Sequence, residues 1–240
     1  MTGKSGLRYP RLDKRIIAIV GGFGSGKTEV SVNLAKYLVA TEKKQISIVD
    51  LDLVNPYFRS REAGRELEAM GIRPIVPPGG LYYADVPVLL PEIKGAIELK
   101  DGKLILDVGG DAQGTRAFGS LADSVDLGDY EMLMVVNGRR PQTSDVAGCV
   151  KTMERIEATA RLKFTGLISN THMIDETTPE IVLEGYELSR EVGRLRDLPL
   201  LFVSAKRNTL EGMDTSVFEC PILPMTRSML KPWERKEDPV

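Results

Sequence analysis

The sequence has few cysteines, few aromatic residues and no excess of charge of one sign. Its 240 residues include two cysteines, too few for a disulfide framework or for a four-thiolate zinc site. This usage is typical of the reducing cytoplasm. Aromatic residues make up 6% of the chain, but hydrophobic residues make up 42%. The composition therefore predicts a globular domain rather than a disordered or fibrous chain.

The charge balance and the lengths of the apolar runs exclude further classes. Lys and Arg number 32 and Asp and Glu 34, a formal net charge of −2, so no global basic field attracts nucleic acid or anionic lipid. No apolar run approaches the about 18 residues of a membrane span. The basic N-terminus is not followed by the apolar segment of a secretory signal. We expect a cytoplasmic protein without an evident nucleic-acid or membrane partner.

Short aliphatic runs alternate with helical stretches along the chain. Helical periodicity is clearest over 28–40, 144–162 and 179–195. The predicted strands are 15–20, 45–50, 72–76, 103–108, 131–136, 164–169 and 198–203. Strands that are apolar on both faces and alternate with helices predict an α/β fold with a doubly wound, mostly parallel sheet of about seven strands.

No repeat, low-complexity tract or long linker divides the chain. We expect one domain over residues 15–230, with a flexible N-terminal segment over 1–14 and a C-terminal tail over 231–240. A glycine-rich loop directly after the first predicted strand indicates that this domain binds a nucleotide.

That loop, from Gly21 to Thr28, reads GGFGSGKT and is followed at once by a predicted helix. It matches the phosphate-loop pattern G-x-x-x-x-G-K-T in the required strand–loop–helix context. Glycines let backbone N–H groups approach phosphate oxygens, Lys27 offers a positive charge to the β and γ phosphates, and the Thr28 hydroxyl suits Mg²⁺. The predicted nucleotide-binding residues here are Gly22, Phe23, Gly24, Ser25, Gly26, Lys27, Thr28 and Glu29.

A later predicted strand ends in an acidic residue suited to a magnesium shell. Leu104 to Asp107 reads LILD and continues as DVGG, the D-x-x-G form in which a glycine amide meets the γ-phosphate. Asp107 is the candidate metal-shell carboxylate, and Gly110 the candidate phosphate contact. The alternative for Asp107 is a carboxylate that caps a turn at the strand end.

The strand after the phosphate-loop helix ends in D-x-D, at Asp50 and Asp52. Together with the phosphate loop, the D-x-x-G strand and a late strand that ends in Asn170, this order of motifs resembles the MinD, ParA and nitrogenase iron-protein group of P-loop ATPases, also described as CobQ/CobB/MinD/ParA nucleotide-binding domains. The likeness covers roughly residues 15–205.

The resemblance implies ATP and Mg²⁺ as cofactors. It implies that Asp52 positions or activates the attacking water, so that Asp52 and Lys27 are the catalytic candidates. Asp50 then joins Thr28 and Asp107 as a metal-shell candidate. The alternative for the two aspartates is a strand end that caps the next helix.

The residues that read the base are predicted from strand ends. The guanine-reading string N-K-x-D is absent. The resemblance implies that Asn170 contacts adenine, and an Asn amide matches the adenine N6/N7 edge. Asn137 ends another predicted strand and is the alternative. Ser204 and Ala205, in an S-A-K loop, are further candidate base contacts, and ATP is favoured over GTP.

One position departs from the family pattern. Dimerising members carry an early lysine in the loop that reaches the partner subunit's phosphates, and the equivalent residue here is Gly22. Activation in trans by that lysine is not expected, although a homodimer is compatible with the sequence. Arg116 and Arg139 are candidates for a different positive charge.

The sequence therefore predicts a Mg²⁺-dependent ATPase, slow without a partner, that acts as a nucleotide switch on an unidentified client protein. The first alternative is an ATP-dependent transferase or ligase of the dethiobiotin or cobyrinate synthase type, with a substrate pocket in the 77–90 and 111–118 loops. The second is a nucleotide-binding scaffold without hydrolysis. Without C-x-x-C spacing around Cys220, no metal cluster is expected. His172, the one histidine, is expected in a loop that contacts substrate or solvent.

Overall fold

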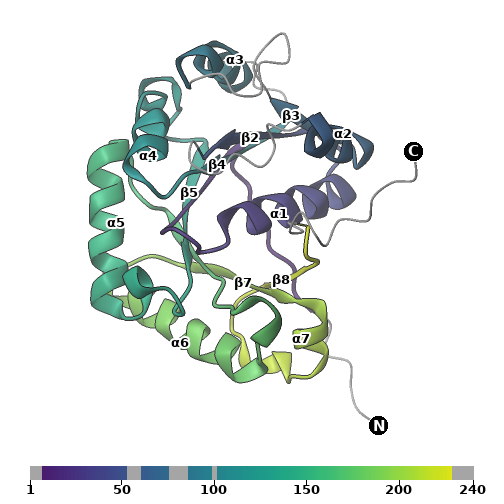
Figure 1. Cartoon of the computed structure of the whole chain (residues 1–240), viewed down its shortest axis with the longest axis vertical. Coiled ribbons are helices and arrows are strands. Elements are labelled where there is room, and N and C mark those ends of the chain that lie inside the picture. Colours follow the sequence, from purple (N-terminus) through teal and green to yellow (C-terminus); the bar gives the residue numbers. More distant parts are fainter. Residues whose placement is uncertain (1–6, 53–60, 76–85, 99–101, 229–240) are drawn as a thin grey trace.

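An eight-stranded parallel sheet lies at the centre of the protein, as the computed structural model in Figure 1 shows. The structure describes residues 7–52, 61–75, 86–98 and 102–228. The strands are β1 Ile16–Val20, β2 Ile46–Leu51, β3 Ile72–Ile75, β4 Lys103–Val108, β5 Tyr130–Val136, β6 Gly166–Ser169, β7 Leu200–Lys206 and β8 Ile222–Met225. The α-helices are α1 Lys27–Thr41, α2 Arg61–Ala69, α3 Val86–Glu98, α4 Ala112–Gly119, α5 Val146–Ala160, α6 Pro179–Arg196 and α7 Arg207–Glu211. Short 3₁₀ turns include η3 Pro141–Thr143 and η4 Ile174–Glu176.

The strand order reverses direction at β1. The sheet runs β3-β2-β4-β1-β5-β6-β7-β8, with every neighbouring pair parallel. From β1 the chain passes to β2 and β3 on one side of the sheet and then returns to β4, which lies between β2 and β1. Strands β5 to β8 follow in order on the other side of β1. Open α/β sheets bind ligands at the carboxyl ends of the strands where the order reverses. The glycine-rich loop follows β1 at this position.

Both faces of the sheet are covered. Along β1, Ile16, Ala18 and Val20 belong to one core, which includes side chains from α3, α4, α5 and α6. Ile17 and Ile19 belong to the other core, which includes side chains from α1 and α2. Figure 1 shows α4 and α5 on one side of the sheet and α1 on the other. The uninterrupted apolar runs in the sequence follow from this burial on two faces.

The predicted α/β class is confirmed, with one more strand than the seven expected. The additional strand, β8, was missed because it is four residues long and contains Pro224. Proline lacks a backbone donor and is tolerated at the edge of a sheet, where β8 lies. Residues 77–85 of the predicted 77–90 loop and the 231–240 tail lie outside the described residues. The rest of the two loops predicted over 77–90 and 111–118 is mostly helical, because residues 86–90 belong to α3 and residues 112–118 to α4.

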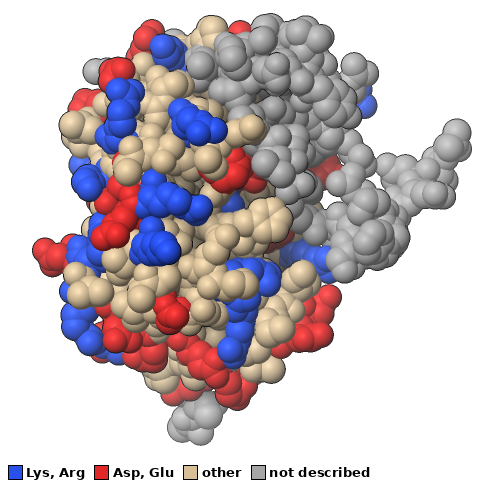
Figure 2. Space-filling model, turned by 60° about the vertical axis from the view of Figure 1, so that its left-hand side comes forward, with Lys and Arg blue, Asp and Glu red and all other residues tan. Residues whose placement is uncertain are grey.

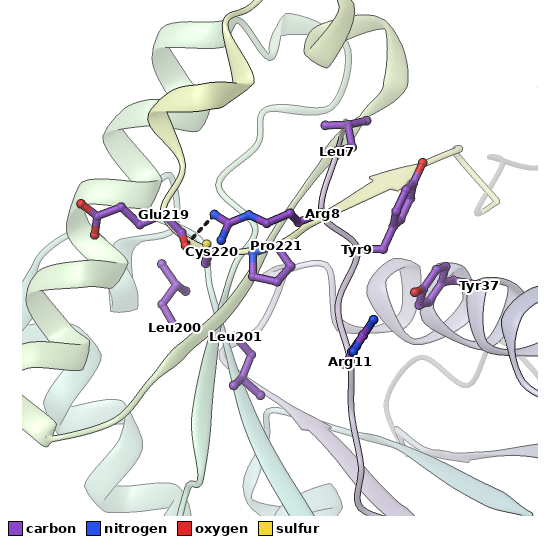
Figure 3. A pocket seen from close by; sticks show the side chains of 10 residues that line it. All are labelled: Leu7, Arg8, Tyr9, Arg11, Tyr37, Leu200, Leu201, Glu219, Cys220 and Pro221. Carbon is purple, nitrogen blue, oxygen red and sulfur yellow. Dashed lines mark hydrogen bonds between the residues drawn. The ribbon is translucent and has the colours of Figure 1, made fainter. Parts of the chain in front are cut away.

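Residues 7–14, the described part of the N-terminal segment predicted over 1–14, pack against the domain. Leu12 is buried, and the backbone N–H of Ile222 donates to the carbonyl of Arg8 at 2.7 Å. The Arg8 guanidinium also donates to the carbonyl of Glu219, as Figure 3 shows, and to the carbonyl of Phe218. The segment is thus attached alongside β8, through contacts more than 200 residues apart in the sequence.

A cavity of about 760 Å³ borders this segment, and Leu200, Leu201 and Cys220 are among its lining residues (Figure 3). It lies at the amino end of β7, away from the carboxyl ends of the strands. Burial raises the pKa of the Cys220 thiol to about 11 and that of Cys149 to about 12. Both thiols are therefore protonated near neutral pH.

The surface carries charges of both signs. On the face in Figure 2, acidic and basic side chains are interspersed rather than gathered into one large patch. This distribution agrees with the net charge of −2. None of the helices in the described ranges is long and apolar enough to span a membrane.

Candidate functional site

The glycine-rich sequence forms a tight turn between the buried strand β1 and the start of α1. Gly24 and Gly26 have φ values of +69° and +88°, in the left-handed region that favours glycine. No side chain caps the start of α1. The N–H groups of its first turn are therefore available to an anion, as a phosphate site requires.

Two further strand ends touch this loop closely. A Cβ on Gly110 would lie 2.1 Å from the carbonyl oxygen of Gly21. A Cβ on Gly26 would lie 2.4 Å from Nδ2 of Asn170. The loop is thus enclosed between the end of β4 and the end of β6, and neither glycine can be replaced without displacing a neighbour.

Lys27 turns back toward the start of the loop. Its buried ammonium Nζ donates to the carbonyl of Gly22 at 3.3 Å. Ser25 is fully buried, and its hydroxyl has no hydrogen-bond partner within the described ranges. Phe23, in contrast, is 69% exposed at the tip of the loop. A buried lysine with one long hydrogen bond beside open backbone donors fits the binding of phosphate oxygens.

Acidic residues meet at the carboxyl ends of β2 and β4. Asp50 and Asp107 are direct neighbours in the parallel register of the two strands, and both are buried. The backbone N–H of Asp52 donates to Oδ1 of Asp50 at 2.9 Å, which holds the third aspartate beside the pair. Like charges at facing positions destabilise a sheet unless a cation compensates them.

Burial raises the pKa of Asp107 to about 7, and the carboxylate of Asp50 is the second cause. The Thr28 hydroxyl and the Lys27 ammonium act in the opposite direction. Oδ1 of Asp107 accepts from the Ser31 hydroxyl at 3.4 Å, but Oδ2 is buried with no hydrogen-bond partner among the residues described. This environment favours a bound cation, because a cation would stabilise the ionised carboxylate.

The residues present fit Mg²⁺. Carboxylate and hydroxyl oxygens are its preferred protein ligands, and Mg²⁺ usually takes one or two carboxylates together with phosphate oxygens and water. Thr28, Asp50 and Asp107 supply such a set. In the described ranges no group of three or more His, Cys, Asp or Glu side chains is arranged to hold a metal ion by itself. A magnesium ion here would therefore depend on a phosphate ligand.

Asn170 ties the loop to the other half of the sheet. Its Nδ2 donates to the carbonyl of Ser25 at 2.8 Å, and its Oδ1 accepts from the hydroxyl of Ser204 at 2.9 Å. The amide is almost fully buried. One Nδ2 hydrogen remains for another acceptor.

Beside this tether lies a cavity of about 340 Å³. The loop side is formed by Gly24, Gly26 and Glu29, and the opposite side by the carboxyl ends of three strands. The lining residues from those ends and from the segments after them are Asn170, Thr171, His172, Ile174, Thr177, Ser204, Ala205, Lys206, Met225, Thr226 and Arg227, with Arg140 from the segment after β5. The structure thus brings the candidate phosphate residues and the candidate base residues to one place.

The alternative base contact, Asn137, does not line this cavity. Its Nδ2 donates to the carbonyl of His172 at 3.4 Å, and its Oδ1 accepts from the backbone N–H groups of Arg139 and His172. Asn137 therefore stabilises the turn after β5 and holds the backbone of His172, in the segment after β6.

Neither arginine considered from sequence is found in contact with the loop in the described ranges. Arg139 forms an ion pair with Glu184, and Arg116 is exposed on α4. Arg140 instead donates from Nε to the carbonyl of Gly24 at 2.7 Å. Sequence reasoning had no signal that distinguishes Arg140 from Arg139, because only the turn geometry separates them.

No protein-family model and no curated protein sequence matches this chain. Solved structures do. The FtsY cell division protein from Thermotoga maritima has 20% identity and a TM-score of 0.56, with 85% of this chain and 66% of that chain covered. A nucleotide-binding protein from Archaeoglobus fulgidus in complex with ADP has 15% identity and a TM-score of 0.51, with 82% and 84% covered. FlhF complexed with GMPPNP and Mg²⁺ has 15% identity and a TM-score of 0.50, with 80% and 66% covered.

At these identities the likeness concerns the fold, which is that of the P-loop NTPases. The chain spans slightly less than two thirds of the FtsY and FlhF structures. None of these three structures is named as a MinD or ParA protein, so the narrower resemblance remains a hypothesis.

Proposed function

We propose that this protein is a Mg²⁺-dependent ATPase that acts as a nucleotide switch on a partner protein. The observation that carries the proposal is the continuity of the 340 Å³ cavity with the glycine-rich loop. A nucleotide needs a turn that binds its phosphates and an adjoining space for its nucleoside, and the glycine-rich turn and the cavity beside it at the carboxyl ends of the strands support this assignment.

The lining of the cavity favours adenine over guanine. Guanine presents N–H donors that require an acidic acceptor, and Glu29 is the one carboxylate among the lining residues in the described ranges. Oε1 of Glu29 already accepts from Nδ2 of Asn33 and from the backbone of Ser228. The remaining Nδ2 hydrogen of Asn170 suits a ring-nitrogen acceptor of adenine.

The acidic group at β2 and β4 supports hydrolysis. Thr28, Asp50 and Asp107 would hold Mg²⁺, which supplies neutralising charge for the phosphates. Asp52 is our candidate for orienting the attacking water, because phosphoryl transfer depends mainly on positioning and charge stabilisation. Lys27 is the candidate that stabilises charge on the transferred group.

The switch itself is assigned to the segment after β4. Gly109 and Gly110 connect this strand to α4, whose first turn is capped by the Asp111 carboxylate at the N–H groups of Gln113 and Gly114. Movement of Gly110 on loss of the γ-phosphate would therefore be passed to α4. The client protein, or a second copy of this chain, would sense that movement. The two free cysteines, Cys149 and Cys220, fit a cytoplasmic location.

Isothermal titration of the pure protein with ATP and Mg²⁺ tests the site. We expect binding to wild type, loss of binding in Lys27→Ala, and wild-type binding in Lys151→Ala, a matched change on the exposed side of α5. GTP should bind more weakly than ATP. Equal ATP binding by wild type and Lys27→Ala would contradict the assignment.

Hydrolysis separates the switch from its alternatives. Slow phosphate release from ATP alone, abolished in Asp52→Ala, supports the ATPase. Release that requires an added small-molecule acceptor would support a transferase, and binding without release would support a scaffold. No observation in the described residues specifically favours the transferase.

A further inference from the structure

The only histidine of the chain lies at the junction between the glycine-rich loop and the cavity. His172 lines the cavity, and its Nε2 lies 2.9 Å from the position of a Cβ on Gly26. The imidazole therefore borders both the last glycine of the loop and the space assigned to the nucleoside. Neither the predicted catalytic group nor the predicted base contacts include it.

Hydrogen bonds from the protein fix the backbone and the tautomer of this residue. Asn137 bonds both the N–H and the carbonyl of His172, each at 3.4 Å. Nδ1 of the ring accepts from the backbone N–H of Ile174 at 3.3 Å. In a neutral imidazole the other nitrogen then carries the hydrogen, so Nε2–H is a donor. No hydrogen bond of Nε2 is found in the part of the chain that the structure describes.

The surroundings keep the ring neutral. Burial, together with the positive charges of Arg140 and Lys206, lowers the pKa of His172 to about 4. The ring therefore acts as a neutral donor near neutral pH and carries no charge of its own toward the phosphates. The function expected for it is a directed hydrogen bond.

Backbone strain supports the same assignment. Ile174 has a φ of +56°, which is unfavourable for a β-branched residue. This conformation accompanies the hydrogen bond from its N–H to Nδ1 of His172. Strain of this kind is concentrated at ligand sites.

We propose that His172 is a specificity-determining residue that donates from Nε2 to an acceptor on the nucleoside part of the bound nucleotide. The inference rests on the proposed function and names a contact that distinguishes a nucleotide from a bare phosphate chain. The imidazole of His172, beside Gly26, can reach the nucleoside that follows the phosphates, whereas Lys27 is the candidate that binds the phosphates.

The test compares ATP and ADP with inorganic tripolyphosphate, each titrated calorimetrically in the presence of Mg²⁺. His172→Phe keeps a ring and removes the donor, and we expect it to weaken ATP and ADP by about 3- to 12-fold. Its affinity for tripolyphosphate should equal that of wild type. His172→Gln, whose Nε2 donor lies at a similar distance from the backbone, should bind ATP within about two-fold of wild type.

Lys27→Ala distinguishes failure of the nucleotide site from failure of the His172 contact, because this variant should lose binding of both ATP and tripolyphosphate. If Lys27→Ala loses ATP but His172→Phe binds it like wild type, the contact is absent and the nucleotide site stands. If His172→Phe loses tripolyphosphate as much as ATP, the ring supports the loop rather than the nucleoside, and the inference fails. Failure of wild type to bind ATP overturns both.

Discussion

Nδ2 of Asn170 donates to the carbonyl of Ser25 at 2.8 Å, although 145 residues separate them in the sequence. The same amide accepts from the hydroxyl of Ser204 at 2.9 Å. One buried side chain therefore joins the glycine-rich loop after β1 to the carboxyl ends of β6 and β7. The shape of the loop depends in this way on strands that follow much later in the chain.

Asn170→Ala should lower both stability and nucleotide affinity. It removes two buried hydrogen bonds and leaves the Ser25 carbonyl without this donor, which costs about 1–3 kcal/mol. Urea denaturation measures the free energy of unfolding, and calorimetry with ATP measures the affinity. A variant as stable as wild type would show that the amide does not hold the loop.

Asp107→Asn should stabilise the free protein while weakening its Mg²⁺-dependent binding of ATP. The substitution removes a buried negative charge that faces Asp50, and we expect a gain of about 1–2 kcal/mol. Asp123→Asn is the matched control, because its carboxylate is exposed and its ion pair with Arg161 contributes little. Thermal unfolding without ligand and titration with and without Mg²⁺ measure the two effects. A destabilised Asp107→Asn would mean that the acidic group is already compensated in the free protein.

The fold could largely be predicted because a sheet buried on both faces leaves uninterrupted apolar runs, as in β1 and β4. The tight turn after β1 was predictable because Gly24 and Gly26 meet a requirement for positive φ that shows directly in the sequence. β8 was missed because Pro224 resembles a break.

The approach of His172 to Gly26 and the hydrogen bond of Arg140 to Gly24 could not be predicted from the sequence. The cavity that both residues line is formed by the ends of separate strands. Arg139 and Arg140 are adjacent arginines, so the local sequence does not indicate which of them contacts the loop. Similarly, no local signal marks the attachment of Arg8 to the residues before β8. Such roles depend on contacts that form only when distant segments meet.

The unfolding free energy should depend on pH through His172. Burial and the nearby charges of Arg140 and Lys206 lower its folded pKa to about 4, whereas an unfolded histidine titrates near about 6.5. Below the unfolded value the unfolded chain takes up a proton that the folded protein does not bind. Stability is therefore lost as the pH falls from about 6.5 to about 4, by at most about 1.4 kcal/mol per pH unit.

His172→Gln isolates this effect, because the other titrating groups are common to both proteins. Urea denaturation at a series of pH values should show wild type losing stability relative to His172→Gln as the pH falls. Parallel curves for the two proteins would mean that the imidazole is protonated as readily in the folded as in the unfolded state.

Ile174→Asn should stabilise the free protein and weaken ATP binding. Asparagine tolerates the left-handed conformation that is costly for a β-branched residue, so we expect a gain of about 0.5–1 kcal/mol. The same change places a polar side chain on an apolar part of the cavity lining. Asp197→Gly is the matched control, because Asp197 also has a positive φ, of +52°, but ends α6 far from the lining residues. It should stabilise without altering ATP affinity. If Ile174→Asn instead loses stability and leaves binding unchanged, the conformation of Ile174 serves packing of the turn rather than the ligand site.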